Sequence, residues 1–433
     1  MLKCEDLRVE VPLDHFGDTP GTIEVYARIV GNADSGGAGG EGGGAGAGTA
    51  GGDKPYLLYL QGGPGVEAFR PTENSPTWLP EALKTHRVVM LDQRGTGLSS
   101  PIGWVDGRFV GTGGAQDPEA VAERMSFYRA DAIVEDAEAV RRALGVERWA
   151  ILGQSFGGFT SLRYLAEHPE SLLSARITGG LARVPQPGAD ADPAIAYART
   201  WQIMREKSQK FFAQHPSAAD AMKKLHARAV TDGIALPDGT VAAEAHVRSL
   251  GLLLGASGGD QKLRFLLEHD VDSAALRHDL QASLPFSARN PLYAAFHETC
   301  WASGAKTDWA ALRARPAEAA DDPLWLSGEH VDPELFRTGP LAVWDDVAQA
   351  LAERDWPVMW DVEKLRKADV PTAAAVYTHD AFVPRDMSRE TAGLLPKCEV
   401  WETDVYEHNG LAASDGEVLR QLNGLLEGMN AAG

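Results

Sequence analysis

The stretch Trp149-Ala-Ile-Leu-Gly-Gln-Ser-Phe-Gly-Gly-Phe-Thr160 decides how this chain folds. Its first four residues form an apolar run typical of a buried strand, and residues 156–167 have the pattern of a helix. Between the two elements, Gly153, Ser155 and Gly157 form a G-x-S-x-G motif. On a tight strand-to-helix turn, glycines on either side prevent collisions and leave the serine hydroxyl at the edge of a sheet. The motif therefore predicts a nucleophilic serine at position 155; the alternative is a serine that caps the helix.

Apolar runs and helix-like segments alternate on both sides of this motif. Tyr56-Leu-Leu-Tyr-Leu60 and Arg87-Val-Val-Met-Leu91 are continuous runs of the kind found in strands covered on both faces. The alternation predicts a doubly wound, mostly parallel sheet, and together with the serine turn it predicts the α/β-hydrolase fold. The expected strands are 7–12, 22–30, 56–60, 87–91, 148–152, 174–178, 371–377 and 398–402, and the expected helices are 126–144, 156–167, 194–214, 218–230 and 415–427.

A long central segment has a different composition. From about Pro185 to Lys367 the chain is rich in helix-forming residues and tryptophan, and few runs resemble strands. We therefore expect a core at 1–184 and 368–433, interrupted by a helical cap at 185–367 that lies over the strand ends, where such sheets bind ligands. The alternative is a plain helical extension with no role in the site.

The overall composition argues against several classes of partner. The 433 residues carry a formal net charge of −20, so we expect no nucleic-acid partner and no membrane partner. Cys4, Cys300 and Cys398 are far apart and no Cys/His ligand spacing occurs, so neither a metal nor an organic cofactor is expected. The N-terminus has no apolar signal segment, which predicts a cytoplasmic protein. Residues 31–54 are half glycine and predict a flexible surface loop.

Two later strand ends supply the partners that a nucleophilic serine needs. In this fold the orienting acid and the histidine base follow the serine in that order, each in a loop after a strand. Asp380 follows the expected strand 371–377, and His408 follows the expected strand 398–402. We therefore predict Ser155, Asp380 and His408 as the catalytic residues. The alternatives are His379 for the base and Asp386 or Asp404 for the acid.

The oxyanion formed during attack on a carbonyl needs two backbone donors. One is the N–H of Phe156, the residue after the serine. The other is expected from Gln61-Gly-Gly-Pro-Gly65, where glycines permit a close approach of the backbone. We assign it to Gly63, with Gly62 as the alternative. A phosphate-binding loop is disfavoured, because the Lys-Ser/Thr of a P-loop and the spacing of a dinucleotide fingerprint are both missing.

A second glycine-rich turn follows the strand at 87–91. Its sequence is Asp92-Gln-Arg-Gly-Thr-Gly-Leu-Ser99. We expect a pair between Asp92 and Arg94 that stiffens this loop beside the site; a direct catalytic role for either residue is the alternative.

Motifs across nearly the whole chain together resemble one known family. The first three are Gln61-Gly-Gly-Pro-Gly65, Asp92-Gln-Arg-Gly-Thr-Gly-Leu-Ser99 and Gly153-Gln-Ser-Phe-Gly-Gly158, in that order. Later blocks are Asn290-Pro-Leu-Tyr293, His297-Glu-Thr-Cys300, Leu326-Ser-Gly-Glu329, Ala374-Ala-Val-Tyr377 and Glu407-His-Asn-Gly410. This combination resembles the proline iminopeptidase (prolyl aminopeptidase) family of serine peptidases, and within it the branch with the larger cap.

The resemblance implies an activity and a set of site residues. Members cleave N-terminal proline from peptides through an acyl-enzyme, and many accept related N-terminal residues. By matching motif, Ser155 would be the nucleophile, Asp380 the orienting acid and His408 the base. The family's cap supplies glutamates that bind the free α-amino (imino) group, and Glu298 and Glu329 lie in the matching blocks; the alternative for each is a surface helix charge. The implied partner is a short peptide with a free N-terminal proline.

Two residues depart from the family pattern, and two other functions stay open. Gln61 stands where many relatives have His, and His330 stands where an apolar residue is expected, which bears on substrate choice. An esterase or amidase for a small metabolite could use the same three catalytic residues. A binding module that kept the fold is the third hypothesis, and the presence of all three residues weighs against it.

Overall fold

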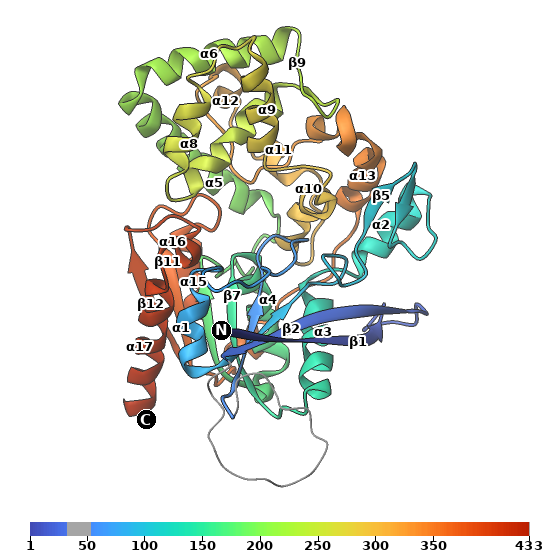
Figure 1. The fold of residues 1–433 in the computed structure, drawn as a ribbon, viewed down its shortest axis with the longest axis vertical. Coiled ribbons are helices and arrows are strands. Elements are labelled where there is room, and N and C mark those ends of the chain that lie inside the picture. The colour runs from blue at the N-terminus through green and yellow to red at the C-terminus, as the bar shows by residue number, and fades with distance from the viewer. Residues whose placement is uncertain (33–52, 433) are drawn as a thin grey trace.

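The computed structural model describes residues 1–32 and 53–432. The glycine-rich segment predicted to be a flexible loop therefore lies mostly outside the described residues. The described chain forms an eight-stranded sheet flanked by helices, with a helical unit above one edge of the sheet (Figure 1).

The central sheet has the strand order β1-β2-β4-β3-β7-β8-β11-β12. The β1–β2 and β2–β4 pairs are antiparallel, and every pair from β4 to β12 is parallel. The predicted fold class is confirmed, since this is a mostly parallel sheet with helices between its strands. The strands are β1 (Leu2–Pro12), β2 (Thr22–Asn32), β3 (Tyr56–Leu60), β4 (Arg87–Leu91), β7 (Trp149–Gln154), β8 (Leu172–Thr178), β11 (Thr372–Tyr377) and β12 (Cys398–Thr403). Two short hairpins are formed by β5 (Gly103–Val105) with β6 (Arg108–Val110) and by β9 (Ile234–Ala235) with β10 (Val241–Ala242).

Helices cover both faces of the sheet, which explains why the central strands are apolar throughout. Leu58 and Leu60 of β3 join the hydrophobic cluster that contains α3 and α4, whereas Leu57 and Tyr59 join the cluster that contains α1 and α17. Successive side chains of a strand point to opposite faces, so both sets are buried. The core helices are α1 (Leu79–Thr85), α2 (Pro118–Ser126), α3 (Ala130–Ala143), α4 (Phe156–Glu167), η1 (Pro169–Ser171), α15 (Arg385–Ala392), α16 (Gly410–Ala413) and α17 (Glu417–Ala432).

The helix expected over residues 126–144 corresponds to α3, which begins only at Ala130; a separate helix, α2, ends at Ser126, so the helical structure breaks between the two. The break coincides with a tertiary contact: Arg94 Nη1 donates a 2.7 Å hydrogen bond to the Phe127 carbonyl. That carbonyl is therefore engaged outside any helix. The guanidinium that makes the contact comes from a distant turn, which helix periodicity alone does not reveal.

The register of the parallel strands places several loops at one edge. Gln154 at the end of β7 pairs with Thr178 of β8, and Ala375 of β11 pairs with the same Thr178. Tyr377 at the end of β11 pairs with Thr403 of β12. The turns after these strands therefore open together, as the sequence predicts.

Between β8 and β11 the chain forms a mainly helical unit, which Figure 1 shows above the carboxyl ends of the strands. The expected boundaries at 184/185 and 367/368 fall in the segments that connect this unit to β8 and β11. Its helices are α5 (Ala194–Gln214), α6 (Pro216–Thr231), α7 (Glu244–Ser249), η2 (Leu250–Gly255), α8 (Gly259–Leu266), α9 (Ala274–Ser283), α10 (Pro291–Phe296), η3 (His297–Cys300), α11 (Ala310–Arg313), α12 (Ala317–Asp321), η4 (Pro333–Phe336), η5 (Gly339–Trp344), α13 (Asp345–Glu353) and α14 (Val362–Leu365).

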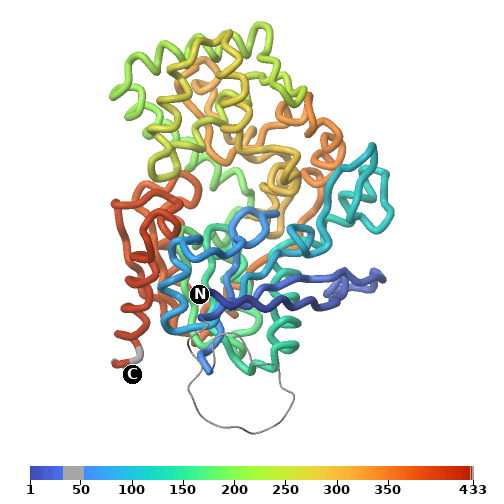
Figure 2. The backbone as a smooth tube through the Cα atoms, viewed as in Figure 1, coloured from blue at the N-terminus to red at the C-terminus, as the bar shows by residue number. Residues whose placement is uncertain are grey.

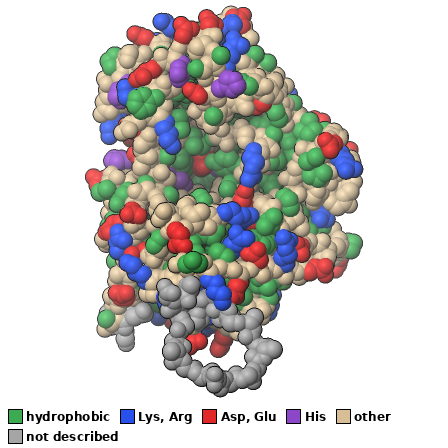
Figure 3. Space-filling model, in the orientation of Figure 1, with side chains coloured by type: hydrophobic (Ala, Val, Ile, Leu, Met, Phe, Trp, Pro, Cys, Tyr) green, Lys and Arg blue, Asp and Glu red, His purple; other side chains and the backbone are tan. Residues whose placement is uncertain are grey.

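The cap has a hydrophobic cluster of its own and also touches the core. Met204, Met222 and Leu263 belong to the cluster that fills the cap from α5 to α9. The last part of the segment returns to the core, where Trp360 Nε1 donates a 3.1 Å hydrogen bond to the Phe159 carbonyl of α4. Figure 3 shows the surface hollowed between cap and core on one face.

Candidate active site

Ser155 lies on a strained turn between β7 and α4. Its backbone has φ 54° and ψ −123°, a conformation that residues other than glycine rarely adopt. Gly157 is required here, because a Cβ at this position would overlap the Leu60 carbonyl oxygen. The Ser155 side chain makes no capping hydrogen bond to α4, so the helix-capping alternative does not describe this serine. The turn leaves its hydroxyl available for chemistry.

Asp380 and His408 form a buried hydrogen-bonded pair. His408 Nδ1 lies 2.8 Å from Asp380 Oδ2 and 3.0 Å from Asp380 Oδ1. The carboxylate is itself fixed, because Oδ1 also accepts hydrogen bonds of 2.9 and 3.0 Å from the N–H groups of Phe382 and Val383. Burial lowers the pKa of His408, but the charge and hydrogen bonds of Asp380 raise it, and the net result lies above the ordinary value.

Three consecutive residues at the end of β8, Thr178 to Gly180, bring the serine and this pair together. Thr178 O accepts a 3.0 Å hydrogen bond from Ser155 N. A Cβ added at Gly179 would lie 3.1 Å from His408 Nδ1 and 3.2 Å from Asp380 Oδ2. A Cβ added at Gly180 would lie 2.6 Å from Ser155 O. The serine, acid and histidine predicted from the sequence therefore share one corner of the sheet edge.

The alternative acid and base residues lie elsewhere. His379 and Asp404 are exposed to solvent. Asp386 is engaged with Arg199, whose Nε lies 3.0 Å from its Oδ2. The structure therefore gives none of these three residues a place in the buried pair.

The glycine turn at 61–65 lies against the serine. A Cβ added at Gly62 would be 3.2 Å from Ser155 Cβ and 3.7 Å from its Oγ, so only glycine fits without displacing a neighbour. Phe156 is the first residue of α4, and its N–H therefore has no acceptor within the helix. Gly63 follows in the same turn with φ 116°. The turn and the start of α4 thus flank the space next to the hydroxyl.

Gln93 holds this turn in place, a role that the sequence did not reveal. Its Nε2 donates hydrogen bonds to the carbonyls of Gln61 at 2.7 Å and Gly62 at 3.3 Å. The side chain of Gln61, which departs from the family pattern, accepts a hydrogen bond from the Tyr59 hydroxyl. The Gln61 side chain is therefore buried at the end of β3, where it hydrogen-bonds to Tyr59.

The prediction that Asp92 and Arg94 pair with each other is wrong, although each of them forms an ion pair that ties the loop to another segment. Asp92 instead pairs with Arg70 at 2.6 Å. Arg94 is fully buried and pairs with Asp136 of α3 at 2.6 Å. Residues two apart in a turn point in different directions, so each finds a partner from another element.

The two cap glutamates differ in what their carboxylates touch. Glu298 is 6% exposed and accepts hydrogen bonds of 3.0 and 2.8 Å from the N–H groups of Ala310 and Ala311. Burial raises its pKa to about 7 against the effect of these bonds. Glu329 accepts a 2.5 Å hydrogen bond from the Tyr293 hydroxyl, and its charge contributes to the raised pKa of His408. Neither residue is a surface helix charge, because Glu298 is buried and Glu329 is partly buried.

Buried polar atoms without hydrogen-bond partners lie near Glu329. Both ring nitrogens of His297 and the Tyr197 hydroxyl are buried and make no hydrogen bond within the described structure. His297 Nε2 is 3.9 Å from Glu329 Oε2, and burial lowers the pKa of this imidazole. The rings of His297 and Tyr293 pack edge to face at 5.3 Å. The neighbours of Glu329 are therefore aromatic, and their unpaired polar atoms are available to hydrogen-bond a ligand.

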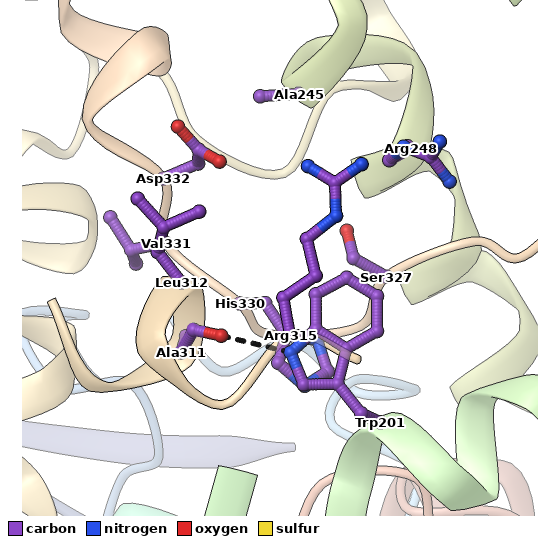
Figure 4. Close-up of a pocket in the computed structure, with 10 residues that line it drawn as sticks. All are labelled: Trp201, Ala245, Arg248, Ala311, Leu312, Arg315, Ser327, His330, Val331 and Asp332. Atoms are coloured by element: carbon purple, nitrogen blue, oxygen red, sulfur yellow. Dashed lines mark hydrogen bonds between the residues drawn. The ribbon is translucent and has the colours of Figure 1, made fainter. Parts of the chain in front are cut away.

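His330, the second departure from the family pattern, is a structural residue. It stacks on Trp201 with a centroid distance of 4.3 Å, and its Nε2 lies 2.9 Å from Thr200 Oγ1. Burial lowers its pKa to about 3, so the ring is neutral. Figure 4 shows it with Trp201 at the edge of a pocket of about 20 Å³, which has room for about one water molecule. This pocket is too small for a peptide.

Two further observations concern metals and membranes. Within residues 1–32 and 53–432, no three His, Cys, Asp or Glu side chains are grouped in a way that could hold a metal ion. None of the helices in the same part of the chain combines the length and apolarity needed to cross a bilayer.

The elbow at Ser155 and the strand order define the class of protein: this chain is an α/β-hydrolase, and the family model described as alpha/beta hydrolase fold matches residues 55–222. A proline iminopeptidase of Aeromonas sobria is 36% identical over 434 residues, which cover 97% of this chain and 96% of that protein. The proline iminopeptidase aneH of Aspergillus aculeatus is 28% identical, with coverage of 98% and 94%. A probable proline iminopeptidase of Streptomyces coelicolor is 30% identical over 38% of this chain and 43% of its own length. The chain belongs to the proline iminopeptidase family, which confirms the resemblance carried by its motifs.

Proposed function

We propose that this protein is a serine aminopeptidase that releases N-terminal proline from short peptides. Family membership supports the reaction class, and the Ser155 corner supports the mechanism. The observation that carries substrate recognition is Glu329, a partly buried carboxylate among aromatic side chains that acts electrostatically on His408. An aminopeptidase must bind a cation next to the scissile bond, and a partly desolvated carboxylate does so far better than an exposed one.

The reaction follows from the roles of three side chains. His408 Nε2 accepts the Ser155 hydroxyl proton as Oγ attacks the prolyl carbonyl carbon. Asp380 holds Nδ1–H and stabilises the imidazolium that forms. His408 then gives the proton to the leaving amine, so the peptide shortened by one residue departs and a prolyl-enzyme ester remains.

Water completes the cycle by the same route. His408 removes a proton from a water molecule that attacks the ester, and the proton returns to Ser155 Oγ when proline leaves. In both steps the carbonyl oxygen becomes negative. We assign its stabilisation to the N–H groups of Phe156 and Gly63, with Gly62 as the alternative in the same turn.

We assign the two cap glutamates different tasks in amine binding. Glu329 contacts the ring ammonium directly, and the Tyr293 hydroxyl orients it. Glu298 is bound to two backbone N–H groups, and we assign it a supporting role, in which it contributes negative charge when it is ionised. Each carboxylate would then be in contact with, or close to, the cation that defines the substrate.

Comparison of two substrates tests this function. The wild-type protein should hydrolyse proline β-naphthylamide and leave N-acetylproline β-naphthylamide nearly untouched, because acylation removes the cation. Glu329→Gln should lower kcat/KM for the free substrate about 100-fold, the usual scale for removing one partner of a desolvated charge pair. Equal rates on both substrates, with no effect of Glu329→Gln, would favour the esterase or amidase hypothesis instead.

A further inference from the structure

The loop that carries His408 is bound to the cap by three hydrogen bonds, one between backbone atoms and two that involve a side chain. His408 N donates a 3.1 Å hydrogen bond to the Gly255 carbonyl at the end of η2. Ser257 N donates a 2.8 Å bond to Asn409 Oδ1, and Glu407 N donates a 3.3 Å bond to Ser257 Oγ. Figure 2 shows the C-terminal core segment, in red, meeting the cap there. Three consecutive residues of the base's loop are thus bound to cap residues about 150 positions earlier in the chain.

An ion pair from another cap helix joins the same loop. Lys207 Nζ of α5 lies 2.6 Å from Glu407 Oε2, and the two side chains are only 12% and 30% exposed. Both residues line a groove of about 400 Å³ between the cap and the catalytic loops. A partly buried pair is screened less by solvent than a surface pair, so it constrains both partners more strongly.

The cap also supports the imidazole through one aromatic ring. A side chain at Gly255 would overlap the Phe382 ring, so the η2 backbone lies directly against that ring. Phe382 in turn packs edge to face on His408 with a centroid distance of 5.0 Å. Its N–H donates a hydrogen bond to Asp380. The cap, Phe382 and the catalytic pair therefore form one continuous packed unit.

We propose that Lys207 is a positioning residue for catalysis, which through its ion pair with Glu407 holds the His408 loop against the cap and keeps the imidazole aligned with Ser155. The inference rests on the proposed role of His408 as the base. It adds a residue that touches neither substrate nor reacting atoms, and that lies 200 positions from its partner in the sequence.

The charges around His408 give this role a distinct signature. The charges of Asp380, Glu329 and Glu407 all raise the pKa of the imidazole. Lys207 offsets the charge of Glu407. Removal of Lys207 alone should therefore raise the pKa of His408 further, whereas removal of Glu407 alone should lower it.

The test compares Lys207→Met with Lys210→Met. Lys210 lines the same groove one turn further along α5, is exposed, and has no ion-pair partner among the described residues. Lys207→Met should lower kcat for proline β-naphthylamide about tenfold with KM changed less than about twofold, since misalignment of the base affects chemistry more than binding. In the pH–rate profile of this variant, the midpoint of the activity loss at low pH should move up by about half a pH unit. Lys210→Met should match the wild type, and Lys207→Arg should recover most of the lost kcat.

A double variant separates alignment from charge. Lys207→Met/Glu407→Gln should return the acid limb close to or below that of the wild type, while kcat stays low because the link remains broken. A fluorophosphonate labels Ser155, and the rate of labelling can be compared between variants. For a variant of reduced stability, the rate is divided by the fraction of folded protein, which its thermal transition gives.

Two results mark failure at different levels. If Lys207→Met matches Lys210→Met in kcat, labelling rate and acid limb, the positioning role of Lys207 is refuted and the proposed function stands. If the wild-type protein neither hydrolyses proline β-naphthylamide nor labels at Ser155, the proposed function itself is refuted, and this inference with it.

Discussion

The Tyr293 hydroxyl donates a 2.5 Å hydrogen bond to Glu329 Oε1 and thereby links the proposed amine site to the glycine turn. The link exists because α10 packs on that turn: a Cβ at Gly65 would overlap Leu292 and lie 3.1 Å from Tyr293 N. The turn proposed to bind the oxyanion and the cap segment proposed to orient the amine ligand are therefore in direct contact. Substrate recognition and transition-state stabilisation share one piece of structure.

Tyr293→Phe tests this link. The variant keeps the ring that packs on His297 and removes only the hydroxyl that fixes Glu329. We expect kcat/KM for proline β-naphthylamide to fall about tenfold, the scale of one hydrogen bond to a charged group. Steady-state kinetics on the variant and on Glu329→Gln/Tyr293→Phe provide the check. Since the hydroxyl acts through the carboxylate, the double variant should be no worse than Glu329→Gln alone, and additive losses would contradict the argument.

Asp380→Asn tests the orientation of the base. The asparagine retains the shape of the side chain, but it cannot stabilise the imidazolium and can favour the wrong tautomer of His408. We expect kcat to fall by about four orders of magnitude, with KM within a few-fold of the wild type. Asp386→Asn is the matched control, because that carboxylate pairs with Arg199 at the surface. A similar loss in both variants would remove Asp380 from the proposed mechanism.

The pH dependence of the wild type follows from the raised pKa of His408. The neutral imidazole is the base, so activity is present above this pKa and is lost as pH falls through it. The acid limb of kcat/KM should therefore have its midpoint above about 6.5, the ordinary value for histidine. A pH–rate profile at constant ionic strength measures this midpoint. In Glu329→Gln the midpoint should move down, because one of the charges that raise the pKa is gone; an upward shift would contradict the assignment.

Local sequence patterns predicted that Ser155, Asp380 and His408 lie at one edge of the sheet, because these residues follow strand ends. Ser155, Asp380 and His408 each come directly after a strand or a few residues beyond it, and parallel strands bring such loops to one edge. Local patterns did not predict which side chains and backbone groups are partners within the cap. The N–H groups that hold Glu298 come from Ala310 and Ala311, on a four-residue helix that no periodicity reveals.

Contacts between distant segments account for the remaining differences. His330 looked like a change in the substrate pocket, yet it stacks on Trp201 of α5 and is neutral. The partner of Glu407 lies on α5, and its identity as Lys207 follows only from how the cap sits on the core. Strand and helix patterns report burial along one element, and they carry no information about which charged side chains meet between elements.

Gly157→Ala tests the strain at the serine turn. The added methyl group would overlap the Leu60 carbonyl oxygen, a backbone atom of the central strand β3 that cannot move aside cheaply. We expect a large loss of soluble folded protein and a lower thermal transition. Gly424→Ala in α17 is the matched control: a Cβ there meets nothing within 4 Å, and alanine favours the helix by up to about 1 kcal/mol. A folded Gly157→Ala protein with wild-type stability would show that the turn is wider than this structure describes.

Glu298 makes stability depend on pH in a direction opposite to that of most carboxylates. Burial raises its pKa in the folded state to about 7, whereas an unfolded chain would hold it near 4.5. Between these values the folded state binds more protons at this site than the unfolded state, so its contribution to stability is present below about pH 4.5 and falls as pH rises towards 7. Glu298→Gln removes this titration. The thermal transition of the wild type, measured relative to that of Glu298→Gln, should therefore decline between pH 5 and 8, by an amount equivalent to at most about 3 kcal/mol. A difference that stays constant with pH, or one that grows in favour of the wild type, would show that this carboxylate is already ionised at pH 5 and is stabilised by its two backbone donors more than burial destabilises it.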